Sequence, residues 1–168
     1  MKKIIEVKNL TKSFTDGATV SQVLKGIDFE VTEGEFVAIM GRSGAGKSTF
    51  LYQMSLLDNP TSGSIKLNGH ITDRMNNQEK TQYRLTELGY VFQDYSLLPE
   101  LTALENIMVP LLMQGISMPV AKNRALKALE SVNLSERTGN LPSELSGGEQ
   151  QRVSIARAVT HKPKILFA

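Results

Sequence analysis

The stretch Gly41-Arg42-Ser43-Gly44-Ala45-Gly46-Lys47-Ser48-Thr49 matches the full pattern of a phosphate-binding P-loop. Apolar residues 36–40 precede it and predict a strand buried on both faces, and residues 47–57 have the pattern of a helix. Glycines let consecutive amides converge on phosphate oxygens, and the helix N-terminus adds partial positive charge. Lys47 is expected to reach the β- and γ-phosphates, and the Ser48 hydroxyl to bind Mg²⁺. The motif alone indicates a nucleoside triphosphate; the alternative is a glycine-rich turn with a chance lysine.

Composition is that of an ordinary globular protein. The 168 residues are 40% hydrophobic and 21% charged, and 19 basic against 17 acidic residues give a net charge of +2. We expect no nucleic-acid partner, because such a partner usually needs a concentrated basic face. The absence of cysteine excludes disulfides and thiolate metal sites. No apolar run approaches the roughly 18 residues that span a bilayer, so we expect a cytoplasmic protein that reaches a membrane through a partner.

Periodicity predicts an α/β fold around the P-loop. Alternating apolar residues in 5–10 and 24–31, separated by a polar loop at 15–21, predict an antiparallel sheet. A face formed by Ala121, Ala125, Leu129 and Val132 predicts a helix. The other predicted elements are strands at 64–67 (ending at the turn Asn68-Gly69), 89–93 and 164–168, and helices at 78–85, within 102–134, and at 148–161.

A second candidate anion site lies at 145–152, Leu-Ser-Gly-Gly-Glu-Gln-Gln-Arg. Ser146 has the chemistry of a helix N-cap, and Gly147 and Gly148 would expose backbone amides at the start of that helix. The same residues are equally compatible with a capped surface helix that binds nothing. The physical pattern alone therefore leaves both interpretations open.

The segment from Leu145 to Glu149, together with the P-loop, resembles the signature of ATP-binding cassette (ABC) proteins, and the resemblance covers the whole chain. It implies ATP and Mg²⁺ as cofactors and an ATPase coupled to transport. It also implies that the signature of one cassette binds the ATP held by the P-loop of another, so that two cassettes sandwich two ATP molecules head to tail. Integral-membrane permease subunits are the implied partners, which would place the protein on the inner face of the membrane. The nucleotide-binding residues implied are Phe14, Gly41, Arg42, Ser43, Gly44, Ala45, Gly46, Lys47, Ser48, Thr49, Ser146, Gly147, Gly148 and Glu149.

Two further positions are similar to family motifs. Phe14 resembles the aromatic residue that stacks on adenine, although the family more often has Tyr; the alternative is a core aromatic at a strand end. Gln93 resembles the Q-loop glutamine of the family. The resemblance implies that its amide approaches Mg²⁺ and the attacking water and that its loop faces the permease. The alternative is a polar residue at the end of a strand. Lys47 and Gln93 are the implied catalytic residues, and Ser48 and Gln93 the implied metal-binding residues.

The resemblance also implies a domain plan. Residues 1–96 would form the antiparallel β-subdomain and a P-loop core whose sheet is mixed and parallel in its middle. Residues 97–145 would form a helical subdomain. Residues 146–168 would form the signature helix and the apolar Walker B strand. Within the family, residues 26–40 and 95–106 resemble the lipoprotein-release, macrolide-export and antimicrobial-peptide-export branch, which implies outward transport or extraction from the membrane.

The family pattern continues after Walker B with an Asp and a Glu, whereas Ala168 is the last residue here. His161 precedes that strand, so it does not match the family's switch histidine, and we expect it to be exposed near a helix end. We expect this polypeptide to bind ATP, to hydrolyse it poorly or not at all, and to expose apolar surface. The alternatives are a non-catalytic nucleotide-binding module and a non-transport ABC ATPase.

Overall fold

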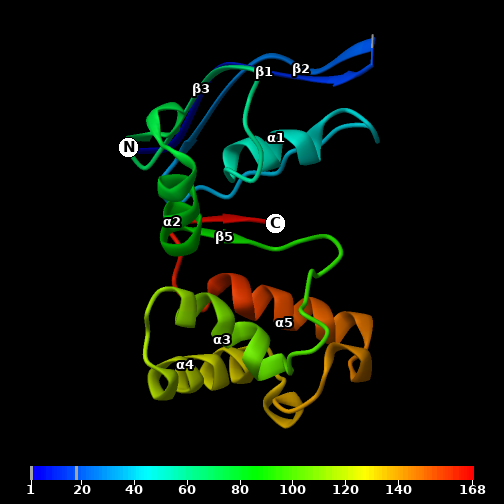
Figure 1. Ribbon diagram of the computed structural model, residues 1–168, viewed down its shortest axis with the longest axis vertical. Coiled ribbons are helices and arrows are strands. Elements are labelled where there is room, and N and C mark those ends of the chain that lie inside the picture. Colours follow the sequence, from blue (N-terminus) through cyan, green and yellow to red (C-terminus); the bar gives the residue numbers. More distant parts are fainter. Residues whose placement is uncertain (1, 18) are drawn as a thin grey trace. The chain divides into compact units, whose positions relative to one another are not determined.

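A computed structural model describes residues 2–17 and 19–168, which form two compact units divided between Thr81 and Gln82. Unit 1 holds the antiparallel sheet and the P-loop. Unit 2 holds three packed helices and a short parallel pair of strands (Figure 1). The fold is therefore α/β, as the sequence predicts, with antiparallel and parallel strands in separate sheets.

Unit 1 is built on a long hairpin of β1 (Lys3–Asp16) and β2 (Thr19–Thr32). β3 (Ser62–Leu67) and β4 (His70–Ile71) extend it into an antiparallel sheet of order β2-β1-β3-β4. The predicted polar loop at 15–21 is wrong, because backbone pairing continues to the Asp16–Thr19 pair. The turn predicted at Asn68-Gly69 is confirmed: both residues have positive φ, as a two-residue hairpin turn requires.

Alternation along these strands puts apolar side chains on one face of the sheet, where Ile5, Val7, Leu10, Leu24, Ile65 and Leu67 are buried. Helix α1 (Lys47–Met54) packs on this core through Phe50 and Met54, and the Phe29 and Phe50 rings meet edge to face at 5.3 Å. The helix ends before the predicted residue 57, since Ser55 is its C-cap and Leu56 has φ 60°.

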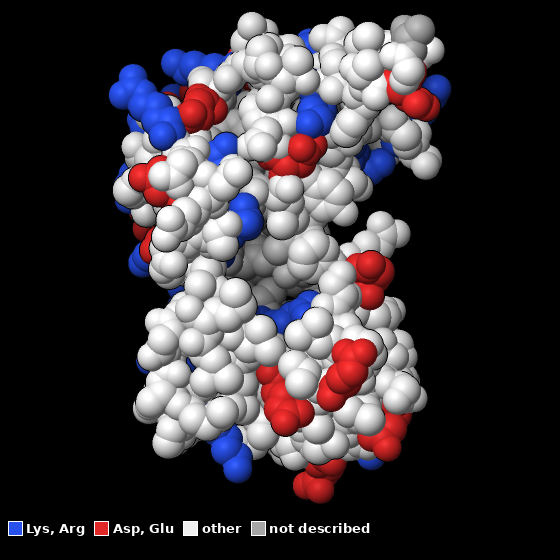
Figure 2. Space-filling view, in the orientation of Figure 1, with Lys and Arg blue, Asp and Glu red and all other residues white. Residues whose placement is uncertain are grey.

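Charged side chains of both signs lie side by side on the visible face of unit 1 (Figure 2). Two ion pairs join neighbouring strands: Lys3 with Glu30 at 2.7 Å, and Lys66 with Glu6 at 2.9 Å. Glu6 and Lys66 are register partners, so this pair also aligns β1 with β3.

Residues 36–40, predicted as a strand buried on both faces, are neither a strand nor buried. Phe36 is 97% and Met40 89% exposed. A strand exists only where a neighbour accepts and donates its backbone hydrogen bonds, and no backbone hydrogen bond is described for these five residues. The expected exposed apolar surface is therefore present, and this segment forms part of it.

Helix α2 (Asn77–Glu87) begins in unit 1 and leads to β5 (Leu88–Tyr90) in unit 2. β5 pairs in parallel with β6 (Ile165–Phe167), in register from Leu88 with Ile165 to Tyr90 with Phe167. Both strands are shorter than predicted. Gly89 is required here, because an added Cβ would lie 2.5 Å from the carbonyl oxygen of Ala158.

The rest of unit 2 is a bundle of α3 (Ala103–Met113), α4 (Met118–Ser131) and α5 (Gly147–Val159). The predicted helical region 102–134 is thus two helices, separated by a turn at Gly115 with φ 78°. The predicted face is confirmed at Ala121, Ala125 and Leu129, which are fully buried. They pack with Ile107, Leu111, Val153 and Ala156. Short 3₁₀ turns occur at Thr72–Arg74, Ser135–Arg137 and Pro142–Glu144.

Candidate functional site

The P-loop lies on the surface of unit 1, with residues 41–45 exposed. Gly44 (φ 77°) and Gly46 (φ 87°) take left-handed conformations that wrap the backbone around the loop. Gly46 is the N-cap of α1 and makes no side-chain cap, so the first amides of the helix, from Lys47 onward, have no acceptor within the helix.

Gly46 is fixed by its neighbours as well as by its φ. A Cβ at this position would lie 2.9 Å from Val23 Cγ1 and 3.2 Å from Leu24 Cδ2. The loop therefore sits directly against β2. The close approach sets where α1 begins and where its free amides point.

The Lys47 ammonium folds over the loop and donates to the carbonyl oxygens of Gly41 at 2.9 Å and Arg42 at 3.0 Å. A cation held above unpaired amides is the donor set that a polyphosphate needs. Ser48, the next residue, is exposed and offers a hydroxyl oxygen, a ligand type that Mg²⁺ accepts. The residues present thus fit a triphosphate with its Mg²⁺.

Phe14 lies near the end of β1 and is 46% exposed, so it is not the core aromatic of the alternative interpretation. The Lys12 ammonium lies 5.0 Å from the centre of its ring. Phe14 pairs with Ser21 of β2, two residues before the Val23 side chain that borders Gly46. Unit 1 therefore brings the predicted adenine-stacking ring to the same end of the hairpin as the P-loop.

The predicted signature forms the start of α5 in unit 2. Ser146 is a true N-cap with extended φ and ψ, and a capping box joins it to Glu149. Glu149 Oε2 accepts from the Ser146 amide at 2.8 Å and from the Ser146 hydroxyl at 2.7 Å. The amides of Gly147 and Gly148, both exposed, have no acceptor within the helix.

A salt bridge steadies this cap: Arg137 Nε donates to Glu149 Oε1 at 3.1 Å. The hydrogen bonds from the Ser146 hydroxyl and amide, followed by the hydrogen bond from Arg137, lower the pKa of Glu149 to about 2. Glu149 is therefore ionised at neutral pH. Its carboxylate is occupied with the cap, while the Gly147 and Gly148 amides keep no acceptor within the helix.

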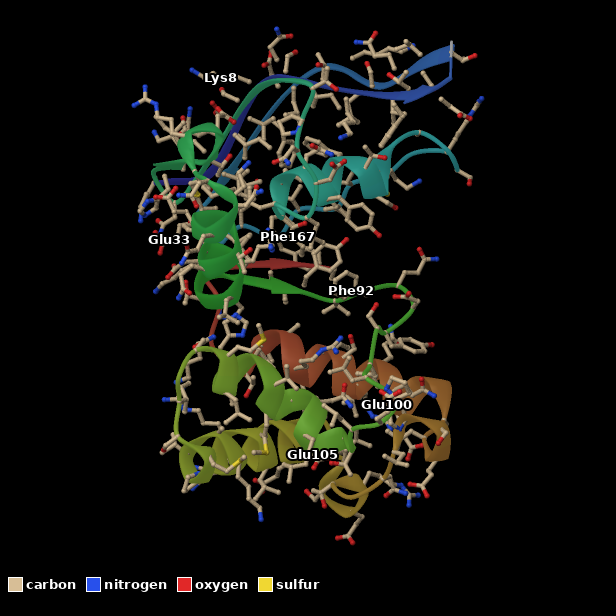
Figure 3. All side chains as sticks on the ribbon, in the orientation of Figure 1. Lys8, Glu33, Phe92, Glu100, Glu105 and Phe167 are labelled. Carbon is tan, nitrogen blue, oxygen red and sulfur yellow. The ribbon has the colours of Figure 1, made fainter. Side chains whose placement is uncertain are left out.

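Gln93 is exposed and lies after the end of β5, not within the predicted strand 89–93. The Val91 amide donates to the Phe167 carbonyl at 2.9 Å, so the chain stays beside β6 up to this loop. Figure 3 labels Phe92 and Phe167 near the carboxyl ends of these two strands; the Tyr90 ring lies 4.5 Å from Phe92 and 6.3 Å from Phe167. Gln93 and the signature belong to unit 2, whereas Lys47, Ser48 and Phe14 belong to unit 1.

The expectation that His161 is exposed is wrong. Its ring is partly buried, Nε2 lies 3.0 Å from the Leu88 carbonyl oxygen, and burial lowers its pKa. Sequence reasoning also missed Arg137 and Arg157, which contact the signature cap and the Gln93 loop respectively. Neither position carries a local signal, since their partners are 12 and 61 residues away along the chain.

A lysine folded over a glycine loop at a helix start, beside an antiparallel hairpin, defines the class of P-loop nucleotide-binding domains. Comparison with known proteins identifies the family within that class. The family model described as ABC transporter matches residues 24–168. The lipoprotein-releasing system ATP-binding protein LolD of Geobacter metallireducens is 48% identical over 168 residues, covering all of this chain and 75% of that protein. LolD of Bacteroides thetaiotaomicron is 44% identical over 165 residues, 98% of this chain and 74% of that one.

Solved structures agree. The cassette MJ0796, in a dimer bound to ADP and Pi, superposes with a TM-score of 0.90 at 42% identity, over 96% of this chain and 72% of that chain. A second dimeric structure of MJ0796, described as a bacterial ABC transporter cassette, superposes with a TM-score of 0.91 at 40% identity. The chain belongs to the ABC transporter family and corresponds to its ATP-binding subunit. Among the described residues, no helix combines the length and hydropathy of a membrane span.

Proposed function

We propose that this chain binds MgATP at its P-loop and pairs with a second cassette, and that the pair drives a permease that moves a substrate outward or extracts it from the membrane. One observation carries the proposal: two described helices, starting at Lys47 and at Gly147, begin with amides that have no acceptor within the helix, and each start lies inside a glycine-containing family motif. A triphosphate bears enough negative charge to use both. A head-to-tail pair lets one chain supply the first set of amides and its partner the second.

The residue roles follow from their chemistry. The amides at the start of α1 and the Lys47 ammonium bind the β- and γ-phosphates, and Phe14 stacks on the adenine. Ser48 and Gln93 would be the residues that hold Mg²⁺, which would neutralise phosphate charge when bound. Ser146, Gly147 and Gly148 of the partner contact the γ-phosphate, while Glu149 holds the Ser146 hydroxyl through the cap. Gln93 orients the attacking water.

Support for the transport role comes from the relatives. Two LolD proteins, named as ATP-binding components of lipoprotein-releasing systems, are 44% to 48% identical to this chain. We infer an equivalent place here: a peripheral subunit on the cytoplasmic face of a membrane, attached to a permease that selects the substrate. The MJ0796 dimers support the pairing of two cassettes.

Sedimentation tests the pairing. The chain is expected to be monomeric alone and dimeric with MgATP. The Ser146→Arg variant should stay monomeric with MgATP, because the larger side chain blocks the signature while the P-loop is untouched. A Ser143→Arg control, on an exposed residue outside the cap, should still dimerise. A parent chain that stays monomeric in saturating MgATP contradicts the proposed pairing.

A second experiment tests the transport role. A tagged chain is added to detergent-solubilised permease subunits of a lipoprotein-releasing system and recovered. Recovery of the permease supports the role, and loss of recovery on Gln93-loop substitution would place the contact there. A chain that hydrolyses ATP rapidly by itself and recovers no permease would favour a non-transport ATPase.

A further inference from the structure

The loop that follows Gln93 contains two consecutive residues in the left-handed region, Tyr95 with φ 62° and Ser96 with φ 45°. This conformation is unfavourable for a residue with a Cβ, because the Cβ approaches the following carbonyl oxygen. Two such residues in one turn persist only where surrounding contacts hold them. Because the turn begins two residues after Gln93, its support also determines how freely Gln93 moves.

Three hydrogen bonds join residues of the turn that are close together along the chain. The Tyr95 amide donates to the Phe92 carbonyl at 3.2 Å, and the Ser96 amide donates to the Asp94 carbonyl at 2.7 Å. The Ser96 hydroxyl donates to Asp94 Oδ1 at 2.7 Å. These bonds use the amides of the turn and involve neither the Tyr95 nor the Ser96 carbonyl oxygen.

Arg157, in the body of α5, binds both of those carbonyls. Its Nη1 donates to the Ser96 oxygen at 2.7 Å, and its Nη2 donates to the Tyr95 oxygen at 2.8 Å. The rigid, planar guanidinium presents two donors at once, which a lysine ammonium does not do in this geometry. Burial lowers the pKa of Arg157. The side chain is thus partly desolvated, and the two short charge-assisted bonds offset that cost.

The same loop touches the start of α5. A Cβ built on Gly147 would lie 3.4 Å from the Tyr95 hydroxyl oxygen. The loop therefore meets α5 at its first residue, Gly147 in the signature, and again at Arg157, ten residues further along. Figure 1 shows the segment after β5 running beside α5 before it enters α3.

We propose that Arg157 is a positioning residue that holds the Tyr95–Ser96 turn against α5, so that the Gln93 loop and the signature helix move as one body. The importance of this coupling rests on the proposed function, in which Gln93 and the signature serve the same reaction. A permease that displaces the Gln93 loop would then displace Ser146 as well.

Amide hydrogen exchange on the 168-residue chain tests the proposal without nucleotide, so that a failure of ATP binding does not enter the result. Arg157→Ala should accelerate exchange at residues 95 and 96 by about tenfold or more, because the turn opens locally. Exchange in the buried part of α3 and α4 should change by less than about twofold. Arg124→Ala, an exposed arginine on α4, should leave every segment unchanged.

Two further variants distinguish a clamp from general packing. Arg157→Lys keeps the positive charge but loses the planar pair of donors. The amide exchange rate of residues 95 and 96 in this variant should therefore lie between the rates in the parent chain and in Arg157→Ala. Glycine adopts positive φ without strain, so adding Ser96→Gly to Arg157→Ala should return residue 95 most of the way to the parental rate. Unchanged loop exchange in Arg157→Ala overturns the proposal. So does faster exchange spread equally over the whole bundle, or a double variant that exchanges as fast as Arg157→Ala.

Discussion

Gly46→Ala should cost more stability than the same change at Gly69, although both glycines have φ 87°. Alanine in the left-handed region costs about 1–2 kcal/mol, and this term is common to both sites. Alanine also lowers the entropy of the unfolded chain, by about 0.4–1 kcal/mol at either site. These two contributions cancel in the comparison.

The expected difference in stability between the two variants comes from the room available for the added methyl group. At Gly69 no heavy atom lies within 4 Å of an added Cβ, whereas at Gly46 the Val23 and Leu24 methyls lie 2.9 and 3.2 Å away. Leu24 is fully buried and has little room to move, while Val23 is only partly buried. Overpacking of this kind costs about 1–3 kcal/mol, and the mobility of Val23 points to the lower half of that range. We therefore expect Gly46→Ala to be less stable than Gly69→Ala by about 1–2 kcal/mol.

Urea unfolding followed by far-ultraviolet circular dichroism measures both variants against the parent chain. MgATP binding should be lost only in Gly46→Ala, because the start of α1 must shift to relieve the contact. Equal unfolding free energies for the two variants would refute the packing argument. Parental ATP affinity in Gly46→Ala would refute the claim that this contact positions the loop.

Three other outcomes are expected. Asn106→Ala should lower the unfolding free energy of unit 2 by about 2–4 kcal/mol in urea, because the fully buried side-chain amide makes hydrogen bonds with four backbone groups of residues 98–102. The control Asn123→Ala, at an exposed residue, should change the unfolding free energy by less than about 0.5 kcal/mol. NMR titration should give the Glu149 carboxyl a pKa of about 2, and Arg137→Ala should raise that pKa. Because folding lowers this pKa, the stabilisation from Glu149 should be complete above pH 4.5 and should be lost as the pH falls toward 2. Phe14→Ala should weaken MgATP binding about tenfold while Phe14→Tyr retains it, and equal affinity of the two would remove the stacking role.

Motifs whose chemistry is local were predictable from the sequence. The P-loop, the Ser146 cap and the Asn68-Gly69 turn each depend on backbone conformations and hydrogen bonds within a few residues. The face of α4 was predictable for the same reason, because its spacing alone places Ala121, Ala125 and Leu129 on one side.

Features that depend on distant partners were not predictable. Residues 36–40 have the composition of a buried strand, but pairing is non-local, and the described chain gives them no backbone partner. The polar composition of residues 15–21 predicts a loop, although the backbone pairing of β1 with β2 continues to Asp16 and Thr19. Arg157 has no motif of its own, and its role emerges only when the fold brings α5 to the turn at Tyr95.

Titration calorimetry with MgATP tests the central claim most directly, using the parent chain, Lys47→Ala and Lys25→Ala, an exposed lysine on β2. The parent chain and Lys25→Ala should bind one MgATP per chain with the same affinity, and Lys47→Ala should show no binding heat at the same concentrations. Equal binding by all three, or no binding by the parent chain at millimolar MgATP, would contradict the assignment of the P-loop as the nucleotide site.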